Sequence, residues 1–435
     1  MGRVEIGILG IAAALFLIGL RMPIGVVLGI VSFLGIVSLV GLEAAWGMLT
    51  SIPLNFVANW NLSAVPMFLL MGFIAARAGL TNGLFTSARI LFGRVPGSLA
   101  SSTVMASALF ASCSGSSMAT AAAFAKISIP EMLKAGYRPS LAAGCVASAG
   151  TLGSLIPPSI LMIIYGIFTN TSIADVFMAG VLPGILSAVM YVVMITTRSI
   201  LDPTLAPVSE SKHSKEELWG ALRDIWPLPT LTLGVLGGIF AGLFTPTEAG
   251  AVGAALALVI AVARRSLQWD AVKKALVETA EGTCTVFIIV IGAVMFSTFL
   301  GLTSVPTKLA EQMLGLADSP LMVIFMISVL YLILGCFVES ASIMLLTLPI
   351  IQPVLTALNI DMVWFGIIVI KLLEIGMITP PVGMCCFVIK SALGNRISLS
   401  EVFRGAGWFV ATDLVTLSII VAFPVIALYL PALMK

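Results

Sequence analysis

Long apolar runs dominate the chain and set its architecture. Eight of them reach or approach the roughly 17–25 residues that a helix needs to cross a bilayer. They lie near residues 4–20, 23–41, 62–76, 176–198, 226–244, 247–263, 283–300 and 403–430. Because a spanning helix satisfies its own backbone hydrogen bonds in lipid, we expect an all-α polytopic membrane protein.

Four further segments are apolar overall but are interrupted by Gly, Ser, Thr and Pro: 97–130, 139–168, 320–350 and 360–389. Proline removes a backbone donor and its ring clashes with the preceding turn, so helices should break in these segments. We predict that 97–130 and 320–350 are re-entrant hairpins. The segments 139–168 and 360–389 are predicted to be broken helices.

Glycine, proline and tryptophan positions of the first half recur in the second half at a shift of about 223 residues. Trp46 corresponds to Trp269, and Pro157-Pro158 corresponds to Pro380-Pro381. The alternative is a chance coincidence among the many glycines and prolines, but tryptophan is rare and both double prolines align. The long polar stretch 199–225 separates the halves. We therefore predict repeat one at 1–198, a cytoplasmic linker at 199–225 and repeat two at 226–435.

Positive charges predict that the two repeats are inverted, because short cytoplasmic loops are enriched in Lys and Arg. Segments 77–94 and 124–138 carry three each, whereas their partners 302–319 and 351–362 carry one and none. Conversely, 42–61 and 169–175 carry none, and their partners 264–274 and 390–404 carry four and three. Each repeat then has about five crossings and one hairpin, with both termini outside. Segments 42–61 and 264–282 contain Trp anchors and are predicted to be interfacial arms.

Composition narrows the possible functions. The 435 residues are 60% hydrophobic and 10% charged, which excludes a soluble enzyme or a nucleic-acid binder. The single histidine, His213, falls in the linker, so most His-based catalysis and metal ligation are excluded. We find no pairing of a nucleophile with a base and expect no enzyme. The first apolar run lacks a small-residue cleavage pattern, so we expect it to be retained rather than removed as a signal peptide.

The helix breaks are the candidate sites, since transporters with inverted repeats bind solute and coupling ion at broken helices near the midplane. The first tip, Ser112-Cys113-Ser114-Gly115-Ser116-Ser117, offers hydroxyls and carbonyls that suit a hard cation such as Na⁺. The alternative is a small-residue packing motif. The two double-proline breaks free carbonyls beside hydroxyls, which favours a cation site over a plain proline kink.

Ionisable residues at membrane depth are the remaining candidates. Glu339, on the second tip, could carry a proton or contact the solute. Lys371 and Glu374, three residues apart on one helix face, are predicted to form a structural ion pair. Asp413 is interpreted as a polar contact between helices, with a role in subunit contact as the alternative.

At these motifs the chain resembles the large membrane subunit (M subunit) of the tripartite ATP-independent periplasmic (TRAP) transporters, within the ion-transporter superfamily. The resemblance spans essentially the whole sequence. Its most specific stretches are Ser114–Ala121, Ile129–Met132, Gly136-Tyr137, Ala149–Gly153, Ile156–Ser159 and Ile378–Gly383.

The resemblance implies Na⁺-driven uptake by an elevator-type movement in the bacterial inner membrane. It implies two partners, a small four-helix membrane subunit and a soluble periplasmic binding protein that delivers the solute. Since no extra helices precede residue 4, we expect the small subunit to be a separate chain. Family substrates are organic acids such as C4-dicarboxylates, other carboxylates or sialic acid. A stand-alone carboxylate carrier, coupled to an ion or to a proton on Glu339, is the alternative function.

The resemblance also assigns residues to sites. One Na⁺ site would use Ser114, Ser117, Gly153, Ile156 and Pro157, and the other would use Gly335, Gly376, Thr379 and Val382. Substrate would lie between the two tips, near Ser116 and Ser340, with Glu339 as a further contact. The two Na⁺ sites cannot be chemically equivalent, because Ile156 takes the place of Thr379 and has no hydroxyl.

Overall fold

A computed structural model describes residues 2–20, 22–81, 83–92, 95–207, 215–316 and 319–434. Every regular element in those ranges is a helix. Seven helical segments in those ranges are long and apolar enough to cross a membrane, counting residues 60–77 and 139–169 each as one segment. The chain is therefore an all-α polytopic membrane protein, as the apolar runs predicted. The linker residue His213 lies outside the described residues.

The described part of the first half contains ten α-helices and one short 3₁₀ helix. They are α1 (Arg3–Gly19), α2 (Ile24–Val40), α3 (Leu42–Val57), η1 (Trp60–Ser63), α4 (Ala64–Arg77), α5 (Leu84–Phe92), α6 (Ser98–Ser114), α7 (Ser117–Lys134), α8 (Pro139–Leu155), α9 (Ile160–Thr169) and α10 (Ile173–Leu201). The predicted linker contains one described helix, α11 (Lys215–Ile225), which packs beside α5.

The second half follows a closely similar order. Its helices are α12 (Pro227–Phe240), α13 (Pro246–Ala263), α14 (Trp269–Thr303), α15 (Val305–Leu316), α16 (Pro320–Gly335), α17 (Ser340–Ala357), α18 (Met362–Gly376), α19 (Met384–Leu393), η2 (Gly394–Arg396), α20 (Leu399–Ala422) and α21 (Val425–Leu433). The hairpin α6–α7 corresponds to α16–α17, and the broken helix α8–α9 corresponds to α18–α19. The inversion of one half relative to the other stays a prediction.

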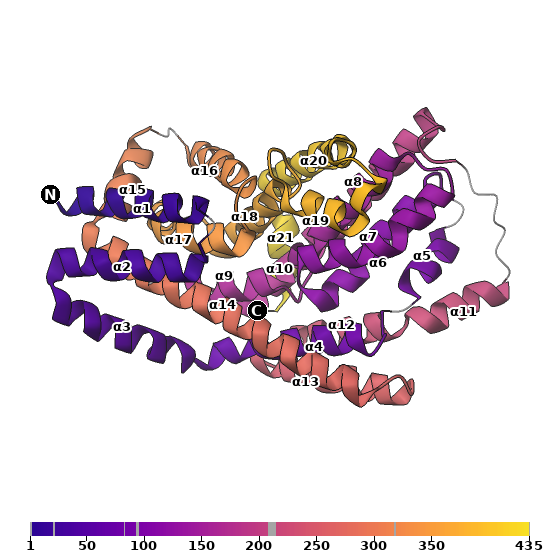
Figure 1. Cartoon of the computed structure of the whole chain (residues 1–435), viewed down its shortest axis with the longest axis horizontal. Helices are drawn as coiled ribbons and strands as arrows, with labels where there is room; N and C mark the ends of the chain where they lie inside the picture. The colour runs from indigo at the N-terminus through magenta and orange to yellow at the C-terminus, as the bar shows by residue number, and fades with distance from the viewer. Residues whose placement is uncertain are drawn as a thin grey trace.

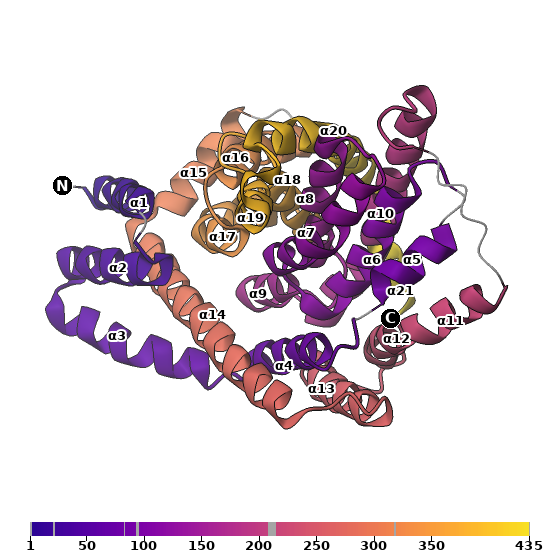
Figure 2. The same ribbon diagram turned by 45° about the vertical axis from the view of Figure 1, so that its right-hand side comes forward.

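The two broken helices form the centre of the molecule. Every residue of α8 from Leu141 to Leu155 is buried, and so is every residue of α18 from Trp364 to Gly376. α8 packs against α6, α7 and α20, and α18 packs against α16, α10 and α20. Figures 1 and 2 show the helices α6 to α9 and α16 to α20 gathered on one side of α14.

Peripheral helices extend away from this centre. α14 lies along α2 and α4, and α4 also packs against α13. In both ribbon views α1, α2 and α3 form the end of the molecule that carries the N-terminus (Figures 1 and 2). Exposed apolar side chains cover these three helices, including Leu9, Phe16, Leu34, Trp46 and Leu54. These faces suit lipid or a membrane partner.

Two helix boundaries differ from the sequence predictions. The arm at 264–282 and the span at 283–300 were predicted as separate helices, but α14 is one continuous helix of 35 residues. No proline interrupts residues 269–303, and three glycines within a helix are tolerated. Conversely, the span predicted at 403–430 is two helices, because Pro424 separates α20 from α21.

Candidate functional site

The first hairpin tip packs directly on the break between α8 and α9. α6 ends at Ser114, Gly115 adopts a φ of 57°, and Ser116 caps α7 by accepting a hydrogen bond from the amide of Ala119 at 3.4 Å. A positive φ favours glycine. A Cβ added at Gly115 would also lie 3.3 Å from the carbonyl oxygen of Pro158. Glycine therefore allows both the turn and its close approach to the break.

The second tip packs in the same way on the break that follows α18. A Cβ added at Gly376 would lie 2.5 Å from the Cα atom of Gly335 at the end of α16. After the break, the amide of Gly383 donates a hydrogen bond to the carbonyl of Cys336 at 3.3 Å. Each tip therefore lies against the broken helix that follows it in the chain. Both breaks contain the predicted double proline, with cis bonds at Pro157-Pro158 and Pro380-Pro381.

The two tips meet at one carboxylate, that of Glu374 on α18. Ser117 of the first tip donates a hydrogen bond to Oε2 of Glu374 at 2.5 Å, and Ser340 of the second tip donates to Oε1 at 3.3 Å. The hydroxyl of Ser117 also lies 2.8 Å from that of Ser154 on α8. All four side chains are buried. Glu374 therefore joins elements from both halves of the chain.

A cavity of about 130 Å³ opens beside this carboxylate. The tips contribute its polar lining, and α9 and α14 contribute apolar side chains such as Leu161 and Ile289. The residues predicted to bind substrate, Ser116, Glu339 and Ser340, all line it. Among the described residues that line the cavity, Glu339 and Glu374 carry carboxylates and none is a Lys, Arg or His.

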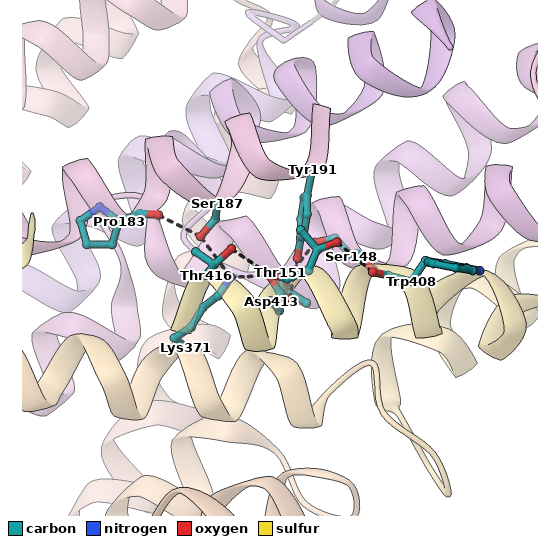
Figure 3. A network of polar contacts seen from close by, with 10 residues as sticks. Ser148, Thr151, Pro183, Ser187, Tyr191, Lys371, Trp408, Asp413 and Thr416 are labelled. Atoms are coloured by element: carbon teal, nitrogen blue, oxygen red, sulfur yellow. Dashed lines mark hydrogen bonds and ion pairs between the residues drawn. The ribbon is translucent and has the colours of Figure 1, made fainter. Parts of the chain in front are cut away.

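Lys371 does not pair with Glu374, so the ion pair predicted from their spacing is wrong. The ammonium group of Lys371 instead donates to Asp413 of α20 at 2.5 Å and to Ser187 of α10 at 3.1 Å (Figure 3). The hydroxyl of Tyr191 donates to the other oxygen of Asp413 at 2.7 Å. This buried network confirms that Asp413 makes a contact between helices. Asp413 therefore compensates the positive charge of Lys371 outside the cavity.

The residues predicted for the first Na⁺ site lie where the first tip meets α8. A Cβ added at Gly153 would lie 3.1 Å from the carbonyl oxygen of Ser116. The hydroxyl of Ser114 lies 2.8 Å from that of Thr120. The remaining members, Ile156 and Pro157, form the start of the break.

The residues predicted for the second Na⁺ site lie where the second tip meets α18. Gly335 and Gly376 are in close contact, and Thr379 and Val382 follow within the break. The hydroxyl of Thr379 donates to the carbonyl of Ile375 at 2.6 Å, which leaves its oxygen lone pairs available to a cation. Both predicted ion sites therefore occupy tip-to-break contacts.

Sequence reasoning missed Glu374 as a site residue. Two signals could have identified it: its charge lies at membrane depth, where ionisable groups are rare, and it precedes Gly376, a predicted ion-site residue, by only two positions. Glu374 was instead interpreted as the ion-pair partner of Lys371, because the two residues are three positions apart on one helix.

Comparison with known proteins identifies relatives of this chain. The family profile "Tripartite ATP-independent periplasmic transporter, DctM component" matches residues 10–426. The sialic acid TRAP transporter large permease protein SiaM of Vibrio cholerae is 35% identical over 381 residues, which cover 87% of this chain and 88% of that protein. The C4-dicarboxylate TRAP transporter large permease protein DctM of Pseudomonas aeruginosa is 37% identical over 376 residues, which cover 86% of both.

A solved structure shares the fold. The YdaH transporter of Alcanivorax borkumensis aligns with a TM-score of 0.64 at 16% sequence identity, over 88% of this chain and 90% of that one. At this identity the similarity concerns architecture alone.

Proposed function

The chain belongs to the DctM family of TRAP transporter large permeases, and on that premise we propose that it performs Na⁺-coupled uptake of an organic acid. It is a multi-pass protein of the bacterial inner membrane. The named relatives are transporter permeases rather than enzymes.

The acidic lining of the cavity is the main observation that supports cation coupling. An organic anion that enters between the tips meets the carboxylates of Glu339 and Glu374, and the described lining supplies no basic side chain to offset them. Like charges repel strongly where little water screens them. Bound cations beside the cavity would remove this penalty, so cargo and cation would bind together.

The proposed cation positions are the two tip-to-break contacts. Na⁺ is a hard cation, and hard cations take oxygen ligands. One position offers the hydroxyls of Ser114 and Ser117 with carbonyls near Gly153, Ile156 and Pro157. The other offers the hydroxyl of Thr379 with carbonyls of Gly335, Gly376 and Val382. The cargo would bind between them at Ser116 and Ser340, with Glu339 at its edge.

An elevator-type movement is the proposed route across the membrane. Both tips and both breaks belong to one closely packed group of helices, α6 to α9 and α16 to α19. Thr285, Val286 and Ile289 of the peripheral helix α14 also line the cavity. A site between a packed group and a peripheral helix can change the side to which it opens if the group slides as a unit.

Partners and cargo class follow from the family. We propose that a separate small membrane subunit covers part of the exposed apolar surface of α1 to α3, and that a periplasmic binding protein delivers the cargo. Relatives named for sialic acid and C4-dicarboxylates support a carboxylate cargo.

Uptake into proteoliposomes tests the proposal. The large and small subunits would be reconstituted together, and uptake of labelled dicarboxylates and sialic acid would be measured with and without Na⁺ and binding protein. We expect uptake only when both are present. Full-rate uptake in the absence of both would contradict the proposal and support a stand-alone carrier. Loss of uptake in Glu339→Gln together with dependence on a proton gradient would support the proton-coupled alternative.

A further inference from the structure

Glu374 already occupies the hydrogen-bond donors that a carboxylate cargo would need. Ser117 donates to one oxygen of its carboxylate and Ser340 donates to the other, from opposite tips. A bound carboxylate between the same tips would require the same geometry, with one donor for each oxygen. Both hydroxyls line the cavity proposed for the cargo. The hydroxyl of Ser117 can donate its proton to a cargo oxygen and still offer lone pairs to the proposed cation, because a hydroxyl is both donor and acceptor.

The basic residue nearest to Glu374 along α18 does not hold it in another position. Lys371 is one helical turn away, but its ammonium group is bound by Asp413 and Ser187 instead. The other charged group in the described lining of the cavity is Glu339, which repels Glu374 rather than binding it. The described partners of this carboxylate are therefore the hydroxyls of the two tips, together with Ser154 of α8. The hydroxyl of Ser340 also lies 3.0 Å from Sδ of Met377.

We propose that Glu374 is an internal competitor of the cargo. Its carboxylate binds Ser117 and Ser340 when no cargo carboxylate does, and it leaves them when cargo binds. While bound, it joins the two tips and the broken helix α18 into one unit, which can cross the membrane without cargo. This inference rests on the proposed function and adds an element that the family resemblance did not assign.

Transport kinetics in Glu374→Gln test the competition. An amide is a weaker acceptor than a carboxylate, so cargo should displace it more easily. At saturating Na⁺ we expect the half-saturating cargo concentration for cargo exchange to fall at least fivefold, with the maximal exchange rate within twofold of the unchanged protein. Net uptake, which requires return without cargo, should fall at least tenfold.

A matched variant separates competition from simple charge removal. Glu339→Gln removes a carboxylate from the same cavity without removing an acceptor from either tip hydroxyl. If it lowers the half-saturating concentration as much as Glu374→Gln does, the effect is electrostatic and the competition is refuted. A higher or unchanged half-saturating concentration in Glu374→Gln also refutes it, as does an equal loss of exchange and net uptake. Glu216→Gln, on the exposed surface of α11, controls for expression and handling.

Hydrogen exchange tests the same inference without transport. In purified protein without cargo, Glu374→Gln should speed amide exchange at least fivefold in peptides covering 112–120 and 336–343, and Glu339→Gln should not. Glu374→Asp, which is too short to reach both hydroxyls, serves as the second variant if Glu374→Gln is poorly folded. Unchanged exchange at both tips overturns the inference. Absence of uptake by the unchanged protein overturns the proposed function instead.

Discussion

A buried ion pair and its hydrogen bonds link three helices. Lys371 and Asp413, whose side chains are 2% and 0% exposed, lie between α10, α18 and α20. Burial of two charges is costly, and the pair offsets that cost only while both partners remain. We infer that the pair serves to position α18. By fixing the rotation of this helix, it keeps Glu374, one turn further on, facing the tips.

Removing one partner should be far more damaging than removing both. Lys371→Met leaves the Asp413 carboxylate buried without its cation, and we expect it to destabilise the protein by about 3–5 kcal/mol. Lys371→Met combined with Asp413→Leu should recover most of that loss. Thermal unfolding of the purified variants in one detergent measures both. Equal losses in the single and double variants would contradict this account.

The hydroxyls of Ser117 and Thr379 should determine the dependence of uptake on Na⁺. Ser117→Ala or Thr379→Ala removes one oxygen ligand, and we expect the apparent Na⁺ affinity to fall about tenfold, which corresponds to about 1.4 kcal/mol. Membrane insertion should be unchanged, and Thr379→Ser should restore the affinity. Na⁺ titration of uptake is the measurement. Unchanged affinity in both alanine variants would refute the ion-site assignment.

The partner of a charged residue was the least predictable feature at this scale. The spacing of Lys371 and Glu374 allows a contact on one helix face. Asp413 competes for the same lysine from a helix that is distant in sequence, and the packing of α20 on α18 decides the outcome. Serines of the tips were easier to identify, because a polar hexamer within an apolar hairpin is costly at membrane depth unless it packs on protein or lines a cavity.

Contacts between elements depend on glycine where the second tip meets α18. Gly376→Ala would place a Cβ 2.5 Å from the Cα atom of Gly335, and backbone on both sides cannot yield as a flexible side chain would. We expect a loss of about 1–3 kcal/mol in stability, as in other overpacked interiors, and displacement of the tip from the break. Thermal unfolding and hydrogen exchange at residues 333–340 measure the two effects.

Gly407→Ala is the matched control for that substitution. Gly407 lies within α20, and apart from its chain neighbours and the backbone of its own helix, no described atom lies within 4 Å of the Cβ that would be added. Alanine is the better helix former by about 1 kcal/mol, so this variant should be slightly stabilised. A similar loss in both variants would show that the close contact between Gly335 and Gly376 is not the cause.

Apolar runs predicted which helices exist better than where they end. The anchor Trp269 suggested a separate interfacial arm at 264–282, and the charges of Lys273 and Lys274 favour the membrane surface for this region. Charge marks where a helix meets the membrane surface, but it does not stop a helix, so α14 continues through that region. Pro424 had the opposite effect, because it ends α20 within an apolar run.

Over the whole molecule, the correspondence of helices between the halves extends the match that the double prolines suggested. Hairpin, broken helix and long following helix occur in the same order in each half. The sequence could predict this correspondence because glycine and proline mark each break. It could not predict that Glu374 would lie between the two tips, since this depends on how α18 packs against both hairpins.

The opposite orientation of the two halves is the prediction on which the transport mechanism depends. Arg89 on α5 and Lys308 on α15 lie in corresponding segments of the two halves. Their segments differ in positive charge, so Arg89 should face the cytoplasm and Lys308 the exterior.

Arg89→Cys and Lys308→Cys would be placed separately in a Cys284→Ser background, since Cys284 is exposed and the other five cysteines are buried. A membrane-impermeant maleimide should label Lys308→Cys in intact cells and Arg89→Cys only after permeabilisation. Labelling of both from the same side would mean that the halves are parallel. Two parallel tips would then approach the cavity from one side of the membrane, and they could not alternate its exposure by the proposed movement.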